Sequence, residues 1–141
     1  MTTPRIQVAI DCADPHALVR FWSAVTGYEI EDHSTGVNQM IEAGYATRED
    51  AVDIDGKLQW ATASACGDTD GTGPRLLFQA VPVPKTVKDR IHLDLHFGED
   101  TREAEVERIL ALGATRLWEA SQGPHSWVTL ADPEGNEFCV A

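Results

Sequence analysis

The chain has 141 residues, 43% of them hydrophobic and 24% charged, which suits one compact domain or two small fused modules. Its net charge of −12 argues against nucleic acid and anionic membrane surfaces as partners, because binding phosphate groups requires Lys and Arg. The sequence shows no secretory leader, no apolar run of ~18 residues and no paired cysteine spacing, so a cytoplasmic protein without a membrane span is expected.

The first half of the chain predicts a strand, a helix and three further strands. Residues 5–12 alternate between apolar and polar side chains, as in a strand that lies under a helix. Its apolar face consists of Ile6, Val8, Ile10 and Cys12. The helix follows, with Asp14 as its N-cap, Trp22 in its core-facing stripe and Gly27 as its C-terminal stop. The other strands are predicted at residues 28–32, 57–64 and 75–81.

Residues 33–56 are the least regular part of the chain. Gly36, Gly44 and Gly56 punctuate this region, and residues 39–50 are compatible with a short helix. Two interpretations remain open, a surface excursion and a lid over a cavity, since long ordered loops are often functional. The proline-containing segment 82–89 then indicates a connector.

The second half predicts the same order of elements. Residues 91–97 alternate as a strand, with Ile91, Leu93, Leu95 and Phe97 on one face and His92, Asp94 and His96 on the other. Thr101 is expected to cap a helix that ends at Gly113. The apolar stripe of this helix contains Ala104, Val106, Ile109, Leu110 and Leu112. Strands are predicted at 115–119, 126–131 and 137–140, with a tight turn at 132–136.

The two halves align as an internal repeat. The aligned pairs are Gln7 with His92, Gly27 with Gly113, Trp60 with Trp127, and Gln79 with Cys139. The sequence therefore predicts an α+β fold of two tandem βαβββ modules, residues 4–83 and 88–141, within a single domain over 1–141. Curved mixed sheets would carry the helices on their outer faces and form a shared cup, the kind of concave site that binds small molecules.

Four segments resemble the vicinal oxygen chelate superfamily, also called the glyoxalase/bleomycin-resistance/dioxygenase fold. They are DCADPHALVRFW, LLFQAVPVPK, RIHLDLHF and WVTLADPEGNEFCV. More narrowly, the chain is similar to the glyoxalase-like bacterial branch. The resemblance implies a homodimer and, in members that use a metal, one ligand from the first and the last strand of each module. By position these slots hold Gln7, Gln79, His92 and Cys139.

This set departs from the family pattern, because only His92 is a conventional ligand. Amide oxygens are weak ligands, and a thiolate does not suit Mg, Mn or Fe centres that bind through oxygen. No carboxylate occupies a slot, so the usual general base is missing. No cofactor is therefore expected, although a divalent metal (Zn, Ni, Mn or Fe) remains an alternative.

Eight residues are candidate ligand contacts, namely Gln7, Trp60, Gln79, His92, Asp94, His96, Trp127 and Cys139. Asp94 is placed to orient His92 as a catalytic acid/base pair, since His titrates near neutral pH. Cys139 is either a small buried hydrophobe or a thiol activated by His92. Trp60 and Trp127 are either matched core residues or aromatic walls of the cup.

The leading hypothesis is a glyoxalase-like small-molecule-binding protein, metal-free or metal-optional, that holds a neutral or cationic organic ligand. The first alternative is a metal-dependent lyase/isomerase or dioxygenase with His92 as the metal anchor. A third hypothesis is acid/base chemistry by His92 and Asp94 without a metal.

Overall fold

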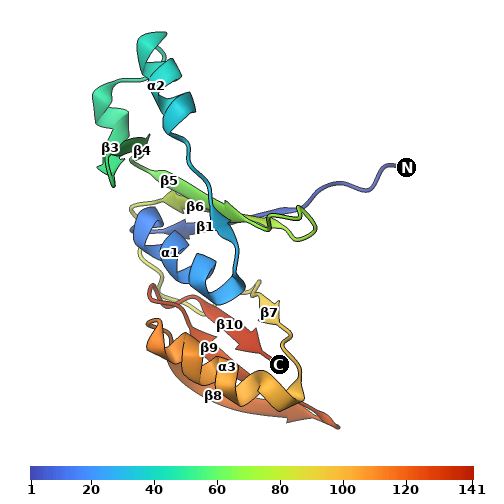
Figure 1. Cartoon of the computed structure of the whole chain (residues 1–141). Coiled ribbons are helices and arrows are strands. Elements are labelled where there is room, and N and C mark those ends of the chain that lie inside the picture. The colour runs from blue at the N-terminus through green and yellow to red at the C-terminus, as the bar shows by residue number, and fades with distance from the viewer. The chain divides into compact units, whose positions relative to one another are not determined.

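The chain folds into two compact units, residues 1–83 and 84–141, which we call the first and second modules. The computed structural model describes all residues 1–141. Each module has a four-stranded mixed sheet and a long helix, so the α+β class and the two-module fold are as predicted (Figure 1). Connector residues 84–87 group with the second module, where Lys85 Nζ lies 3.1 Å from a carboxylate oxygen of Glu137.

The sheet of the first module has the strand order β1-β6-β5-β2. These strands are β1 (Gln7–Cys12), β6 (Arg75–Ala80), β5 (Ala63–Gly67) and β2 (Glu29–Ile30). The first and last strands, β1 and β6, pair in parallel, and the other neighbours are antiparallel. The crossover helix α1 (Pro15–Thr26) connects β1 to the far edge strand β2.

Helix α1 forms where the sequence predicts it, because both ends are capped. The Asp14 carboxylate accepts hydrogen bonds from the backbone N–H groups of His16 and Ala17, each at 3.1 Å. Gly27 ends the helix with a φ of 77°, which glycine adopts without strain. Trp22 is buried, as predicted. In β1 the alternation holds for residues 7–12, whereas Ile6 precedes the strand and is exposed rather than in the core.

Residues 33–62 form an insertion whose elements differ from the prediction. It contains α2 (Ser34–Glu42), the 3₁₀ turn Arg48–Asp50, and a hairpin of β3 (Ala51–Ile54) and β4 (Lys57–Trp60) (Figure 1). The helix therefore begins five residues before the predicted 39–50 segment. The predicted strand 57–64 was wrong, since β4 ends at Trp60 and β5 belongs to another sheet. Asp55-Gly56, with positive φ at both residues, is the hairpin turn signal that the prediction missed.

Polar contacts anchor this insertion to the rest of the first module. The Asp32 carboxylate accepts hydrogen bonds from Lys57 Nζ at 2.9 Å and from Gln59 Nε2 at 2.8 Å. These bonds, led by the one from Lys57, hold the pKa of Asp32 well below its usual range. Whether the insertion acts as a lid stays an open prediction.

The sheet of the second module repeats the first, with the order β7-β10-β9-β8. Its strands are β7 (Asp94–Leu95), β10 (Glu137–Val140), β9 (His125–Ala131) and β8 (Thr115–Gln122). Strands β7 and β10 pair in parallel, as β1 and β6 do. The turn 132–136 forms as predicted, with Asp132 accepting hydrogen bonds from Glu134 and Asn136. Equivalent positions in the strand order therefore support the internal repeat.

Three details of the second module correct the sequence prediction. The ladder of β7 covers only residues 94–95, and Ile91 is 88% exposed instead of facing a helix. Helix α3 (Glu99–Ala111) begins at the N-cap Gly98, and the Thr101 hydroxyl donates to the Phe97 carbonyl instead of capping the helix.

The stripe of α3 is also narrower than predicted. Val106 and Ile109 are fully buried, whereas Ala104 and Leu112 are exposed.

The alignment of Trp60 with Trp127 is also wrong. Trp60 pairs with Ala51 in the β3–β4 hairpin, whereas Trp127 pairs with Ala120 inside the main sheet of the second module. The two side chains therefore do not occupy equivalent positions. The similar sequences around the two tryptophans belong to different elements, a hairpin strand in the first module and a central strand of the main sheet in the second.

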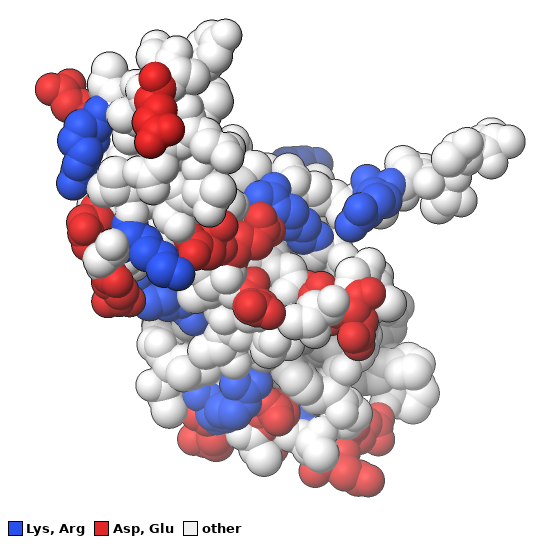
Figure 2. Space-filling model, turned by 45° about the horizontal axis from the view of Figure 1, so that its top comes forward, with Lys and Arg blue, Asp and Glu red and all other residues white.

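Each module has its own apolar core. The largest fully buried side chains are Leu18, Trp22 and Phe78 in the first module and Ile109, Leu130 and Phe138 in the second. Basic and acidic side chains are interspersed on the face drawn in Figure 2, and many form ion pairs such as Arg75–Glu31 and Lys57–Asp32. None of the helices combines the length and the apolar character needed to cross a membrane.

The buried thiol of Cys66 makes the first module sensitive to alkaline pH. Burial raises the pKa of Cys66 from 9.0 to about 11, and the nearby Glu31 carboxylate adds to this effect. Because the folded chain holds this proton more tightly than the unfolded chain does, stability is unaffected well below pH 9 and falls as the pH rises from about 9 to about 11.

We expect this thiol to account for a loss of about 2–3 kcal/mol over that pH interval. The measurement is the free energy of urea unfolding at pH 8 and pH 11 for wild type and Cys66→Ala. The substitution lowers stability at both pH values but should reduce the drop between them. Equal drops in the two proteins would show that Cys66 does not titrate as described.

Candidate functional site

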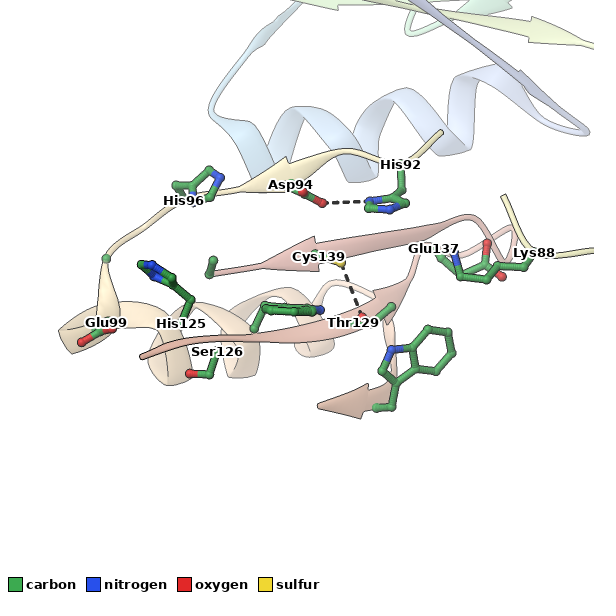
Figure 3. A pocket seen from close by; sticks show the side chains of 14 residues that line it. Lys88, His92, Asp94, His96, Glu99, His125, Ser126, Thr129, Glu137 and Cys139 are labelled. Atoms are coloured by element: carbon green, nitrogen blue, oxygen red, sulfur yellow. Dashed lines mark hydrogen bonds and ion pairs between the residues drawn. The ribbon is translucent and has the colours of Figure 1, made fainter. Parts of the chain in front are cut away.

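The second module contains a pocket of about 550 Å³ on one face of its sheet (Figure 3). Alternation along the strands creates it: Trp127 and Thr129 of β9 line the pocket, whereas Val128 and Leu130 are buried in the core. The lining residues are Lys88, His92, Asp94, His96, Gly98, Glu99, Trp118, His125, Ser126, Trp127, Thr129, Glu137, Cys139 and Ala141. Its size lies within the range typical of small-molecule sites.

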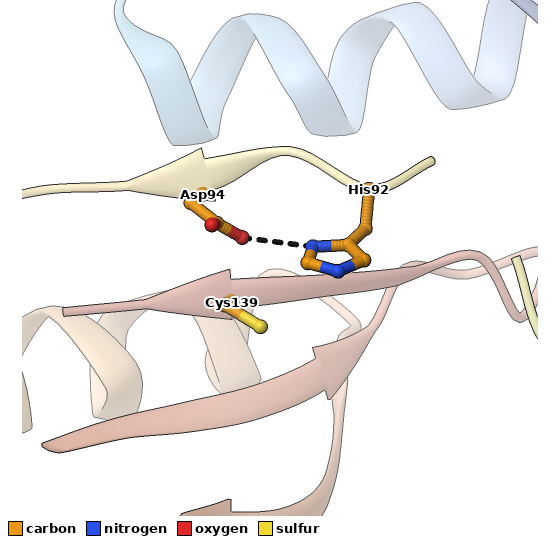
Figure 4. A group of neighbouring side chains, drawn as sticks. All are labelled: His92, Asp94 and Cys139. Atoms are coloured by element: carbon orange, nitrogen blue, oxygen red, sulfur yellow. Dashed lines mark hydrogen bonds and ion pairs between the residues drawn. The ribbon is translucent and has the colours of Figure 1, made fainter. Parts of the chain in front are cut away.

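Three chemically active side chains meet in this pocket, namely His92, Asp94 and Cys139. The parallel pairing of β7 with β10 sets Asp94 beside Cys139, and His92 precedes Asp94 by two residues on the same side of the chain. His92 Nδ1 lies 2.8 Å from Asp94 Oδ1, a hydrogen bond drawn in Figure 4. One potential ligand atom from each of the three residues lies within 4.8 Å of the others. We call this group the His-Asp-Cys cluster.

The surroundings of Cys139 keep its thiol protonated. Burial raises the pKa of Cys139 above its ordinary value, and the negative charge of Asp94 raises it further. Thr129 acts in the opposite direction through a contact of 3.4 Å between its Oγ1 and the Cys139 sulfur. The thiol is therefore a weak nucleophile in the absence of a metal or a bound electrophile.

Glu137 lies at the start of β10, where it binds Lys85 and Asp89 of the connector. Burial alone would raise its pKa, but hydrogen bonds from the Asp89 backbone N–H at 3.0 Å and from Lys85 outweigh burial and keep the pKa of Glu137 low. Its charge is thus compensated by Lys85.

His96, Glu99 and His125 line the opposite end of the pocket from His92 and Lys88 (Figure 3). The pocket therefore has polar groups at both ends.

The structure brings five of the eight predicted contact residues into this pocket. These are His92, Asp94, His96, Trp127 and Cys139. Trp60 lies in the β3–β4 hairpin of the first module and is not among the lining residues.

Gln7 and Gln79 do not converge within the first module. Gln7 pairs with Arg75 and Gln79 with Asp11, so the two residues lie four positions apart along the β1–β6 ladder, a backbone separation of about 13 Å at ~3.3 Å per residue. The Gln7 side-chain oxygen also accepts a hydrogen bond of 2.7 Å from Arg75 Nη1. The amide ligands implied by the resemblance are therefore not brought together.

Several lining residues were missed by the sequence analysis. Thr129 follows Trp127 by two residues and Glu137 precedes Cys139 by two, so strand alternation alone would have found both. His125 begins β9, is exposed, and also lines the pocket. No sequence pattern indicated that Trp118 and Glu99 line the pocket, because their positions depend on how β8 and the start of α3 pack around the sheet.

The His-Asp-Cys cluster fits some metals better than others. Three N, O and S donors with room for a fourth ligand match the ligand number of catalytic zinc sites. Tetrahedral zinc holds its ligand atoms about 3.6 Å apart, a spacing that lies within the 4.8 Å separating the three potential ligand atoms. A thiolate donor fits Mg or Mn poorly.

Removing the charge of Asp94 should make Cys139 more reactive. In Asp94→Asn, the pKa of Cys139 should fall towards its ordinary value because the neighbouring negative charge is lost. Each unit of lowering should speed alkylation by about threefold at neutral pH, since the gain in thiolate outweighs the loss of nucleophilicity. Mass spectrometry after iodoacetamide pulses measures the rate at Cys139, with the buried Cys12 and Cys66 as slow internal references.

Asp100→Asn is the matched control for this experiment, because Asp100 is exposed on α3 and does not line the pocket. An alkylation rate unchanged in Asp94→Asn would contradict the electrostatic role given to Asp94.

Comparisons with known proteins agree with this architecture. Residues 7–141 match the family described as a glyoxalase-like domain. A glyoxalase/bleomycin resistance protein/dioxygenase family enzyme from Burkholderia phytofirmans is 17% identical with a TM-score of 0.64, covering 95% of this chain and 94% of that one. A search of curated proteins gave no match.

Two further solved structures come from proteins with stated activities. A mutant of the fosfomycin resistance protein FosX from Listeria monocytogenes, complexed with Mn(II) and 1S,2S-dihydroxypropylphosphonic acid, has a TM-score of 0.64 at 12% identity, covering 99% of this chain and 90% of that chain. The oxidase ChaP-H2 has a TM-score of 0.61 at 15% identity, covering 99% and 93%. At these identities the similarity shows the fold alone.

Proposed function

The chain belongs to the glyoxalase-like domain family, and we propose that it binds a small organic molecule, neutral or positively charged, without requiring a metal. The observation that carries this proposal is the pocket of about 550 Å³ in the second module. A pocket of this size is large enough to enclose most of a metabolite-sized ligand. The proposal concerns binding, because the surroundings of the Cys139 thiol raise its pKa and keep it protonated.

The charges of the pocket support a neutral or cationic ligand. Three carboxylates line it, namely Asp94, Glu99 and Glu137, against one lysine, Lys88. Lys85 compensates Glu137 from outside the lining. The charged side chains that line the pocket therefore carry an excess of negative charge, as does the whole chain, whose net charge is −12. A negatively charged ligand would have to lose its hydration shell beside these carboxylates, which is unfavourable.

Aromatic side chains add a second reason to expect a planar or cationic ligand. Trp127 is half-buried and Trp118 is 45% exposed, and both line the pocket. An indole face attracts a cation within about 6 Å by about 0.5–2 kcal/mol. His92, His96 and His125 supply hydrogen bonds around it.

A metal-dependent lyase/isomerase or dioxygenase is the second candidate function. The observation that favours it is the His92–Asp94 hydrogen bond of 2.8 Å beside Cys139. A divalent ion bound there would polarise an oxygen of the substrate. His92 and Asp94 would both supply ligand atoms to this ion. The same pair could exchange a proton with a substrate without a metal, which is the third candidate.

We further propose a cytoplasmic homodimer. The dimer rests on the family resemblance, and the reduced location is supported by three cysteines that form no disulfide. Light scattering should give twice the chain mass of 15.4 kDa. A mass of one chain at micromolar concentration would contradict the dimer.

The binding proposal is tested with a charge series of aromatic probes in the presence of a chelator. Benzyltrimethylammonium, benzyl alcohol and benzoate share a ring but differ in charge, and calorimetry measures the affinity of each. We expect the cation to bind most tightly and benzoate not to bind. Tighter binding of benzoate would overturn the proposed ligand class.

Substitutions locate the binding to the pocket. Glu99→Gln should lower the affinity for the cationic probe by about 2- to 10-fold, as expected for the loss of one partly screened charge. Glu107→Gln on the exposed face of the same helix should have no effect. His92→Ala should reduce affinity by about 1–3 kcal/mol if His92 hydrogen-bonds to the ligand. Equal effects of Glu99→Gln and Glu107→Gln would place binding elsewhere.

A further inference from the structure

We propose that His92, Asp94 and Cys139 form a divalent metal site within the second module alone, that Asp94 is its carboxylate ligand, and that it selects zinc over manganese. This inference goes beyond the proposed function, which does not require a metal. It also differs from the ligand set that the sequence implies, in which each module gives two ligands and Asp94 none.

The backbone arrangement places the three donors without help from the first module. The β7–β10 register sets Asp94 beside Cys139, and the two-residue strand period brings His92 to the same side. The three potential ligand atoms lie within 4.8 Å of one another. Because both strands belong to one sheet, the cluster depends only on the fold of the second module.

The hydrogen bond between His92 and Asp94 marks the two groups that would share the ion. The bond between His92 and Asp94 uses Nδ1 of the ring and Oδ1 of the carboxylate. Metal binding would replace this hydrogen bond: Nδ1 of His92 and the carboxylate of Asp94 face each other, so an ion between them would bind both groups in place of the shared proton. Thr129 Oγ1, 3.4 Å from the Cys139 sulfur, adds a hydrogen-bonding partner for a bound thiolate.

The side chains are open enough for an ion to enter. The side chains of His92 and Asp94 are 36% and 50% exposed, and both line the pocket. Figure 4 shows the Cys139 sulfur and the His92 ring facing the same space. A fourth coordination position would therefore face the pocket, where water or a substrate oxygen fits.

The chemistry of the donors gives the selectivity. Sulfur and imidazole ligands favour zinc and cobalt, whereas manganese and magnesium prefer carboxylates, carbonyls and water. Gln7 and Gln79 lie at backbone positions about 13 Å apart along their own ladder, at ~3.3 Å per residue, and so do not form a pair of oxygen ligands within the first module. Manganese, which the FosX structure contains, is thus the ion that this cluster should reject.

Cobalt substitution tests the site directly, without an activity assay. Untagged full-length chain is treated with chelator and a phosphine reductant, desalted, and titrated with Co(II). We expect one Co(II) ion to bind per chain and to give a near-ultraviolet charge-transfer band from the cobalt–thiolate bond. Added Zn(II) should displace the Co(II) and abolish the band. An excess of Mn(II) should leave the band unchanged. Failure to bind Co(II) or Zn(II), or displacement of Co(II) by Mn(II), would overturn the proposal.

Variants assign the ligands. Cys139→Ser should abolish the charge-transfer band. His92→Ala and Asp94→Ala should each lower the affinity for Zn(II) by at least about tenfold. His125→Ala is the matched control, because it removes a histidine from the same pocket outside the cluster. If Asp94→Ala binds Zn(II) as tightly as the wild type does, Asp94 is not a ligand of the metal.

Alkylation in the wild-type chain keeps the test valid if a variant misfolds. Bound Zn(II) should slow the modification of Cys139 at least tenfold, while Mn(II) should not protect it. An equal alkylation rate with and without Zn(II) would contradict thiolate ligation. These measurements contain no organic ligand, whereas the probe series contains chelator, so either proposal can fail independently of the other.

Discussion

The parallel pairing of the first and last strands is the constraint on which each module depends. A parallel pair requires a crossover, and the helix that supplies it covers one face of the sheet. In the second module the same pairing fixes Asp94 beside Cys139, while Phe138 and Val140, one residue to either side, enter the core. Core and site are thus two consequences of a single register: a shift of one residue would bury the thiol and expose the core side chains.

The two modules share a strand order but not a chemistry. In the first module, Arg75 binds Glu31 through Nε at 2.6 Å and Gln7 through Nη1 at 2.7 Å, so its charged groups are engaged with one another. In the second, His92, Asp94 and Cys139 line a pocket. The two modules are therefore similar frames whose outward-facing strand residues differ.

Family membership limits the function less than the site does. The neighbours include a fosfomycin resistance protein bound to Mn(II) and an oxidase, and the fold serves both. What distinguishes this chain is a thiol where an oxygen ligand would suit manganese, in a pocket whose carboxylates outnumber its one lysine. On these residues rest our proposals of a zinc-selective cluster and of a ligand without negative charge.

The sequence by itself determined the α+β fold, the repeat, helix α1 with its two caps, and the polar face of residues 91–97 that carries His92, Asp94 and His96. These features follow from period-two and period-3.6 patterns and from cap residues, which act within a few residues of chain. The tertiary structure decided the rest: that Trp60 lies in a hairpin, that Gln7 and Gln79 sit apart, and that Asp94 joins His92 and Cys139. Each of these depends on strand register between segments distant in sequence, and no local pattern encodes the alignment of two strands.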